Sequence, residues 1–240
     1  MPVDIFNNAT CNTSIIYAPY LVLKPLSKQL QAEAKRLEKQ GLKNQIIVDI
    51  GCGQKPFRTY FSPLASKYWG VDIDSNSLAD VISSAHTLPF KDSSVDIVLC
   101  LQVLEHCEYP DRILSEIHRI LHPDGIALVS THGTAVYHPV LEDYWRWTHK
   151  GLYVAFKSAG LEVTKVLPNG GPIACLFFLG ITLLCMFTYQ SRWLTWMRWF
   201  FVPFFNFVGD KLDSLFFGHI YPKSKFLLVA NYLVISRKSL

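Results

Sequence analysis

The sequence predicts an α/β fold in which helices cover both faces of a doubly wound, mostly parallel sheet, with an apolar helical insert before the last strand. Short apolar runs rich in β-branched residues alternate with amphipathic stretches, and turns containing glycine or proline separate them. The 240 residues are enough for one such domain with an elaboration, since half are hydrophobic and only 18% are charged. This composition excludes a disordered or fibrous chain.

The first expected elements are a helix and a strand that is closed by a glycine turn. Apolar residues recur with helical spacing over 24–40, and Gly41 is placed to end that helix. The run "QIIVDI" at 45–50 reads as a buried strand, and "GCGQKP" follows it. Further strands are expected at 67–73, 95–102, 126–132, 161–167 and 231–238, and further helices at 109–121 and 148–160, with "HPDG" as a turn.

The order of these elements divides the chain into three parts. Residues 1–44 are an N-terminal segment with its helix, residues 45–168 and 231–240 are the sheet domain, and residues 169–230 are the insert. In such a sheet the ligand binds at the carboxyl ends of the strands, near the point where the strand order reverses. The glycine turn, the acidic end of the second strand and the loop after the third converge at that place.

The glycine turn indicates a nucleotide-type cofactor other than a nicotinamide. A nicotinamide-binding turn reads G-x-G-x-x-G, whereas Lys55 and Pro56 stand here where further glycines would be expected. About twenty residues on, Asp72 is placed to accept hydrogen bonds from ribose hydroxyls. A tight strand-to-helix turn with no ligand, and Asp72 as a helix cap, is the structural alternative.

Four segments follow one another in a characteristic order: "VDIGCG", "GVDID", "LPFKDSSVDIVLCLQVLEH" and "EIHRILHPDGIALVS". Together they resemble the class I S-adenosylmethionine-dependent methyltransferases, more narrowly the methyltransferase type 11-like subgroup. The resemblance covers about residues 40–168 and returns at 231–238. It implies a Rossmann-like sheet of seven strands, S-adenosyl-L-methionine as the cofactor and methyl transfer as the activity.

The same resemblance assigns cofactor contacts in four groups along the chain. They are Asp49, Gly51, Cys52 and Gly53 in the turn beside the methionine part, Asp72 and Ile73 at the ribose, Ser84, Ala85 and His86 at the adenine, and Cys100, Leu101 and Gln102 facing the methionine moiety. The sequence departs from the family pattern at two positions. Ser84 stands where an acidic residue is common, and Lys55 replaces the third glycine of G-x-G-x-G.

The acceptor side is expected in the loop after the strand that ends at His132 and in "HPVLEDYWRWT" at 138–148, which is similar to a box of that subgroup. The candidate catalytic residues are His132, Asp143 and Arg146. His132 could act as a general base or could be satisfied by a backbone carbonyl. Arg146 could bind an anionic substrate group, or pair with Asp143 or Glu142.

Other polar residues near this edge allow two interpretations. Glu105 and His106 in "VLEH" could open a loop beside the cofactor or cap the following turn, and Trp145 and Trp147 favour packing over stacking on a substrate. None of the six cysteines has a nucleophile's partner pattern. Their scattered positions argue against a metal site and a disulfide framework, and for a reducing compartment.

The insert predicts contact with a membrane. Residues 171–190 carry no charge, and tryptophans beside Arg192 and Arg198 follow them, as is typical of a membrane boundary. A single crossing is impossible because the last strand must return to the sheet, and Pro203 breaks the second apolar run. We therefore expect 172–218 to lie on the bilayer as a hairpin. A dimer interface, a cover for a lipid-like substrate's tunnel and a double span are the alternatives.

Charge is divided unevenly, with a balance of −1 over residues 1–120 and +5 over residues 121–240. Nucleic acid is not an expected partner, because Lys/Arg clusters that could follow phosphates are absent. No basic and apolar secretory leader opens the chain, so a cytoplasmic location, peripheral to the inner face of a membrane, is expected.

The function expected is therefore S-adenosylmethionine-dependent methyl transfer to a small-molecule, lipid- or glycan-linked acceptor. A homodimer is compatible with this expectation. A catalytically inactive, methyltransferase-like binding or scaffold protein is the alternative from another class. A nicotinamide oxidoreductase is disfavoured by the missing third glycine.

Overall fold

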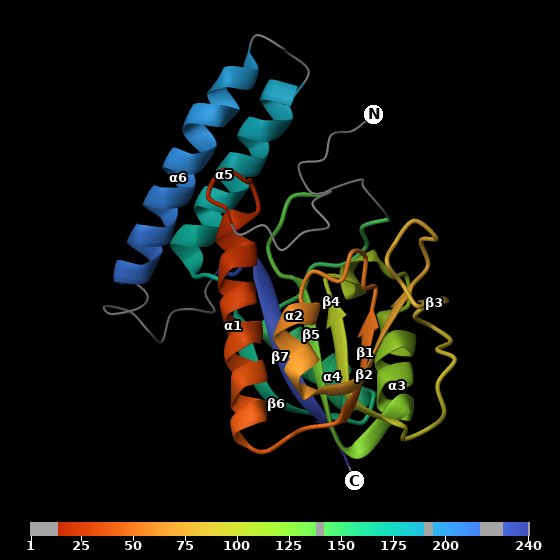
Figure 1. Cartoon of the computed structure of the whole chain (residues 1–240). Helices are drawn as coiled ribbons and strands as arrows, with labels where there is room; N and C mark the ends of the chain where they lie inside the picture. The colour runs from red at the N-terminus through yellow and green to blue at the C-terminus, as the bar shows by residue number, and fades with distance from the viewer. Residues whose placement is uncertain (1–13, 138–141, 190–193, 217–227, 240) are drawn as a thin grey trace.

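The computed structural model describes residues 14–137, 142–189, 194–216 and 228–239. Its centre is a seven-stranded sheet with the strand order β3-β2-β1-β4-β5-β7-β6. Figure 1 shows helices on both faces of this sheet and a pair of helices that rises from one end of it. The predicted α/β, Rossmann-like class is confirmed.

The described elements largely follow the predicted order. The strands are β1 (Gln45–Ile50), β2 (Ala65–Asp72), β3 (Val81–Ile82), β4 (Val95–Leu101), β5 (Leu121–His132), β6 (Leu161–Pro168) and β7 (Asn231–Lys238). The helices are α1 (Tyr20–Lys39), α2 (Arg58–Phe61), α3 (Pro110–Ile120), α4 (His149–Ser158), α5 (Pro172–Tyr189) and α6 (Thr195–Leu215), with the short 3-10 helices η1 (Ser62–Leu64) and η2 (Leu104–His106).

The strands β2 and β5 begin earlier than the sequence predicts, and β5 does so through a segment that was predicted as a turn. Leu121 pairs with Val95 at the start of β4, and Ile126 pairs with Ile97, so the residues of "HPDG" form an irregularity inside β5. The predicted separate turn is wrong because pairing with β4 continues on both sides of these residues. The short elements β3 and α2 were not predicted, since two to four residues are too few to show a periodic pattern.

The sheet reverses its order between β1 and β4. β1 pairs in parallel with β2 on one side and with β4 on the other, and β4 pairs in parallel with β5. β7 is antiparallel to both of its neighbours, β5 and β6. The carboxyl ends of β1, β2 and β4 therefore meet at one edge, which is where a doubly wound sheet binds its ligand.

Two apolar layers hold the helices to the sheet. Side chains of β1 alternate between them, with Val48 and Ile50 in the layer under α3 and α4, and Ile47 in the layer under α1 and α2. Ile113 and Ile117 of α3 are fully buried in the first layer. Burial on both faces explains why the strands read as continuous apolar runs.

The helices α5 and α6 form a hairpin between β6 and β7, and we call it the α5–α6 hairpin. It has a core of its own, in which Phe178 and Ile181 of α5 and Val202 of α6 pack with the start of α1. Arg192, which the sequence places at a membrane boundary, lies outside the described residues. Within the described parts of the chain, no helix has the length and apolar character needed to cross a membrane.

Candidate cofactor and acceptor site

A cavity of about 370 Å³ opens at the carboxyl ends of β1, β2 and β4. The predicted cofactor residues that line it are Gly51, Asp72, Ile73, Ser84, Ala85, His86 and Gln102. Its wall is completed by residues that the sequence analysis did not assign to the cofactor, among them Val103, His106, Glu108, Glu142 and Tyr144. The cavity thus lies at the predicted edge of the sheet.

The glycine turn requires glycine at its first position. Gly51 has φ +66°, and a Cβ atom there would lie 2.3 Å from Cγ2 of Val103. Gly53 also has a positive φ of +49°, but a Cβ atom there would meet nothing within 4 Å. The two positions therefore differ in what a side chain would do to the cavity.

The carboxylate of Asp72 ties the turn to the end of β2. Its Oδ2 accepts a hydrogen bond from the backbone N–H of Gly53 at 2.8 Å, and its Oδ1 accepts one from Asp74 N–H at 2.9 Å. Asp72 also lines the cavity. The residue assigned to the ribose therefore holds the assigned turn in place.

Lys55 has a structural role that explains its departure from the family pattern. Its φ is +51°, and its buried Nζ lies 2.6 Å from Asp80 Oδ2, which also accepts a hydrogen bond from Gly70 N–H at 2.7 Å. Although burial alone would raise the pKa of Asp80, the hydrogen bonds from Lys55 and Gly70 lower it. Lys55 does not line the cavity and braces β2 from behind the turn.

Five residues assigned to the cofactor do not line the cavity, namely Gly53 and four residues whose side chains are buried elsewhere. Asp49 is buried and accepts a hydrogen bond from Tyr68 Oη at 2.7 Å, while Cys52 is buried below the turn. Cys100 and Leu101 point into the apolar layers on opposite faces of the sheet. Only the main-chain atoms of Cys100 and Leu101 are therefore available to a cofactor. This corrects the expectation that the two side chains face the cofactor.

Cysteine chemistry is not indicated at this edge. Burial raises the pKa of Cys52 to about 12 and the pKa of Cys107 to about 11, so both thiols are protonated near neutral pH. Within the described residues no group of three or more His, Cys, Asp or Glu side chains could hold a metal ion.

The segment 142–148, which the sequence assigns to the acceptor, contributes Glu142 and Tyr144 to the cavity wall. Tyr144 N–H donates to Glu105 O at 2.8 Å, and Trp147 N–H donates to His132 O at 3.0 Å, which lays the segment across η2 and the end of β5. Nδ1 of His106 donates to the main-chain oxygen of Glu142 at 2.8 Å. Residues 138–141 of the predicted acceptor segment lie outside the described residues.

Of the two alternatives for Arg146, the structure has the ion pair with Asp143. The Nη1 and Nη2 atoms of Arg146 each lie 2.6 Å from an oxygen of the Asp143 carboxylate. The remaining N–H groups donate to the main-chain oxygens of Ala135, Val136 and Trp145 at 2.8–3.0 Å. All five donors of the guanidinium are thereby used. Neither Arg146 nor Asp143 lines the cavity, and their ion pair with these hydrogen bonds fastens the segment 142–148 to residues 135 and 136.

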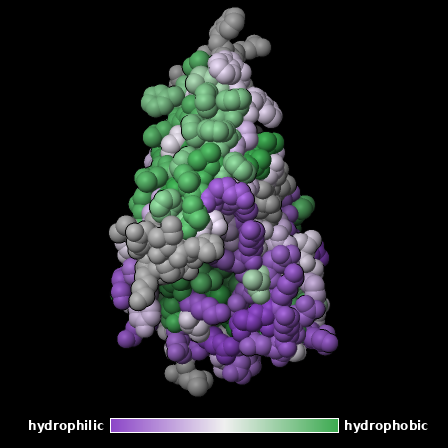
Figure 2. Space-filling view, turned by 90° about the vertical axis from the view of Figure 1, so that its left-hand side faces the viewer, coloured by the Kyte–Doolittle hydropathy of each residue, from purple (hydrophilic) through white to green (hydrophobic). Residues whose placement is uncertain are grey.

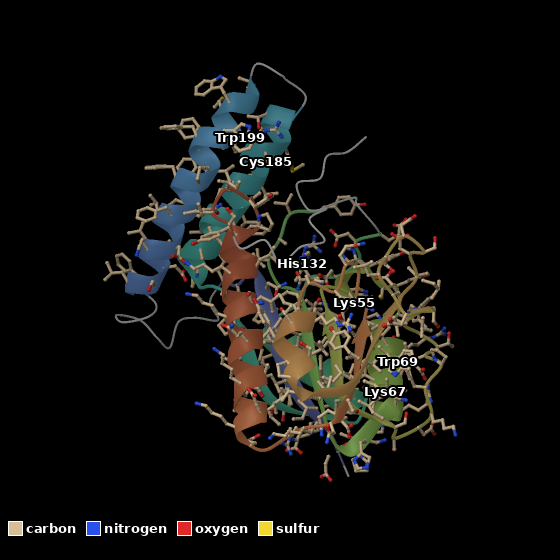
Figure 3. The ribbon with its side chains drawn as sticks, viewed as in Figure 1. Lys55, Lys67, Trp69, His132, Cys185 and Trp199 are labelled. Carbon is tan, nitrogen blue, oxygen red and sulfur yellow. The ribbon has the colours of Figure 1, made fainter. Side chains whose placement is uncertain are left out.

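Glu105 and His132 form a buried pair behind the cavity wall. The Glu105 carboxyl is fully buried; its Oε2 accepts from Thr131 Oγ1 at 2.9 Å, and its Oε1 lies 3.4 Å from His132 Nε2. Burial raises the pKa of Glu105 to about 7. The ring of His132 lies edge-on to that of His106, which lines the cavity, with 6.4 Å between ring centroids. Figure 3 shows His132 at the same end of the sheet as Lys55.

This arrangement can exchange a proton near neutral pH. A carboxyl with a pKa near 7 that lies beside an imidazole and close to a cavity is typical of sites that accept or donate protons. Sequence reasoning named His132 for this role and left Glu105 and His106 undecided. The spacing of "VLEH" and "STH" alone gives no sign that the three side chains meet.

Comparison with known proteins finds a methyltransferase domain in this chain. Residues 48–129 match the family model of a methyltransferase domain. A Mycolicibacterium smegmatis protein named "Probable S-adenosylmethionine-dependent methyltransferase" is 31% identical over 103 residues, which cover 39% of this chain and 40% of that protein. An uncharacterised protein of Methanocaldococcus jannaschii is 30% identical over 157 residues, 61% of this chain and 65% of that one. The chain thus spans less than two thirds of these relatives' length.

A solved structure of a protein with low sequence identity has a similar fold. The [4+2]-cyclase SpnF superposes with a TM-score of 0.57 at 15% identity, covering 91% of this chain and 81% of that chain. At this identity the likeness is one of fold.

Replacing Glu105 with Gln should change how stability depends on pH. The pKa of this carboxyl rises from 4.5 to about 7 on folding, so the folded protein binds more protons than the unfolded chain between these values. The wild type therefore loses unfolding free energy as pH rises through this range, and Glu105→Gln does not. Denaturant unfolding should show the variant gaining roughly 2–3 kcal/mol over the wild type between pH 5 and pH 8.

Glu162→Gln is the matched control, because Glu162 is exposed on β6. Titrating groups away from Glu105 are shared by the variant and the wild type, so their contributions cancel in the comparison. An equal pH dependence of Glu105→Gln and the wild type would contradict the assignment of a buried, protonated Glu105.

Proposed function

We propose that this chain, which carries a methyltransferase domain of the S-adenosylmethionine-dependent class at residues 48–129, transfers a methyl group to a small-molecule, lipid- or glycan-linked acceptor at a membrane surface. The observation that carries the proposal is the cavity where the glycine turn and the Asp72 carboxylate meet.

The charge of the cavity suits a positively charged cofactor. Asp72, Glu108 and Glu142 line it, and no lysine or arginine stands among the described lining residues. A dinucleotide would need donors for its pyrophosphate, whereas S-adenosylmethionine has a cationic sulfur and an ammonium group. Gly51 leaves room where a Cβ would displace Val103, and Asp72 offers acceptors to a ribose.

The cofactor supplies a methyl group on a positively charged sulfur, so it carries most of the chemistry. The chain must hold the acceptor in line with that methyl group and keep water out. The segment 142–148 provides the acceptor wall with Glu142 and Tyr144, and the pair of Arg146 and Asp143 keeps this segment in place. For an acceptor that enters protonated, His106 with the Glu105–His132 pair behind it is the group that can take up the proton.

The α5–α6 hairpin supports contact with an anionic bilayer. One face of α6 exposes aromatic side chains at helical spacing: Trp196, Trp199, Phe200, Phe204 and Phe207. Figure 2 shows apolar side chains gathered over the hairpin, while the sheet domain below is mostly hydrophilic. Exposed tryptophans with Arg198 in the same helix are typical of an interfacial segment. In Figure 1 the hairpin stands at the end of the sheet to which β1 and β4 point, so a bound membrane would lie near the cavity.

A second candidate function is binding, or another reaction, without methyl transfer. It is favoured by the likeness in fold to SpnF, a [4+2]-cyclase, and by Ser84, which brings no carboxylate to the adenine side. Cofactor binding without turnover on any lipid or metabolite extract would support this alternative. Appearance of a methylated product in an extract treated with protein and cofactor would exclude it.

The cofactor assignment is tested with two alanine variants of the glycine turn. The wild type should bind S-adenosylhomocysteine with micromolar affinity in calorimetry. Gly51→Ala should lower this affinity at least about tenfold, equivalent to ~1.4 kcal/mol, because the added Cβ must displace the Val103 side chain. Gly53→Ala shares the positive φ but adds its Cβ in open space, and should bind clearly better than Gly51→Ala. A folded wild type that binds no S-adenosylhomocysteine would refute the proposed function.

The membrane assignment is tested by flotation with vesicles of phosphatidylcholine and phosphatidylglycerol. The double variant Trp196→Ser/Trp199→Ser should lose most vesicle binding, because interfacial tryptophans contribute much of the contact. Trp69→Ser is the matched control, since Trp69 is exposed on β2, away from the hairpin (Figure 3). Equal binding by the double variant and the control would contradict the assignment, as would a wild type that forms dimers through the hairpin and ignores vesicles.

A further inference from the structure

A series of buried side-chain hydrogen bonds begins at the cavity. Gln102 lines the cavity and has φ +59°, a left-handed conformation that residues other than glycine rarely adopt. Its Nε2 donates to Ser130 Oγ at 2.8 Å, and its Oε1 accepts from Asn231 Nδ2 at 2.9 Å. Its backbone N–H donates to Ser130 O at 2.9 Å. Gln102 is therefore held in an uncommon conformation by β5 and β7.

Asn231 extends the series away from the cavity. This fully buried residue opens β7, and its Oδ1 accepts a hydrogen bond from Nδ2 of Asn169. The backbone N–H of Asn169 donates to the main-chain oxygen of Asn231 at 2.8 Å. Asn169 is also buried and follows directly after β6. Both ends of the insert are thus joined to each other and to Gln102.

The hydrogen-bonded pair of Asn169 and Asn231 is the junction between the sheet and the insert. The residues that follow Asn169 attach this junction to both helices of the α5–α6 hairpin. Gly171 N–H donates to Asp213 Oδ2 at 2.8 Å, and Ala174 N–H donates to Asp213 Oδ1 at 3.0 Å. Asp213 belongs to α6, so α6 caps the first turn of α5. A Cβ atom on Gly171 would lie 2.7 Å from Asp213 Oδ1, which shows how closely the junction packs against α6.

We propose that Asn231 and Asn169 are positioning residues that couple the cofactor cavity to the base of the hairpin. A buried amide that loses its hydrogen-bond partner destabilises the folded state, so the series is most stable when all of its members are paired. A shift of the hairpin base that separates Asn169 from Asn231 also weakens the hold on Gln102. Because coupling between sites is reciprocal, a ligand that fixes Gln102 must order the hairpin base.

The inference rests on the proposed function insofar as the cavity binds the cofactor. It adds a regulatory consequence, since contact of the hairpin with a bilayer and occupation of the cavity then influence each other. Occupation of the cavity should therefore be detectable at residues 169–174, at the base of the hairpin.

The test combines calorimetry with hydrogen exchange followed by mass spectrometry. In the wild type, S-adenosylhomocysteine should slow exchange over 169–174. Asn231→Asp keeps the size of the side chain but removes the donor to Gln102, and should lower affinity about tenfold and abolish this protection. Asn169→Ala removes the hydrogen bond to Asn231, which lies one residue further from the cavity. This variant should lower the affinity for S-adenosylhomocysteine by only about threefold while also abolishing the protection at 169–174.

Ser236→Ala is the matched control. Ser236 is a fully buried polar residue of the same strand, and its Oγ has no hydrogen-bond partner among the described residues. This variant should keep both the affinity and the protection at 169–174. The same affinity and protection in Asn231→Asp as in Ser236→Ala would overturn the coupling.

A measurement without ligand separates this inference from the proposed function. In the free protein, Asn231→Asp should speed exchange over both 101–104 and 169–174 relative to Ser236→Ala. Unchanged exchange at these two segments overturns the inference whether or not the cofactor binds. A wild type that binds no S-adenosylhomocysteine refutes the proposed function, while faster exchange of both segments in Asn231→Asp would still support the positioning role.

Discussion

The return of β7 into the sheet is the constraint on which the rest of the structure depends. β7 pairs antiparallel with β5 along one side and with β6 along the other, and Pro168 at the end of β6 lies opposite Tyr232. The insert must therefore leave and re-enter the sheet at neighbouring positions, and two helices packed side by side satisfy this condition. The same pairing sets Asn231 opposite His132, at the edge where the parallel strands end. The position of the hairpin near the cavity follows from this strand order.

At that edge, two cationic side chains form ion pairs with carboxylates of the same chain, and these pairs hold the cavity wall in place without lining it. Lys55 binds Asp80 and braces β2, and Arg146 binds Asp143 and three main-chain oxygens that hold the acceptor wall. Each ion pair has one buried partner, Lys55 in the first and Asp143 in the second, so breaking either pair would leave a buried charge without its partner and cost more than breaking a fully exposed pair would. Because the cations are used in this way, carboxylates dominate the charge of the cavity. A cationic ligand fits this division of charge.

The sequence was sufficient where the signal is local and insufficient where it depends on distant partners. β7 was predicted to the residue because an apolar run ends at charged residues, and the glycine turn was predicted because a motif marks it. The start of β5 was missed because "HPDG" has turn chemistry and only pairing with β4 extends the strand through it. Cys100 and Leu101 were placed at the cofactor although their side chains enter the core, since a strand buried on both faces has no periodicity that marks a ligand side. The ion pair of Arg146 could not be told from an anion site, because Ala135 and Val136 contribute acceptors that no spacing reveals.

The hairpin has one face that packs on α1 and another that exposes aromatic side chains, and this difference supports contact of the exposed face with a bilayer. The face toward α1 is already filled by Phe178, Ile181 and Val202, so the exposed aromatic face of α6 is not needed to hold the hairpin together. Monomeric proteins rarely expose contiguous apolar patches of this kind unless the patch contacts another surface. A bilayer that covers this face leaves Asp213 and the junction at Asn169 undisturbed, because both lie at the base of the hairpin. Under the two proposals made above, the Asn169–Asn231 junction would transmit the orientation of a membrane-bound hairpin to Gln102 in the cavity wall.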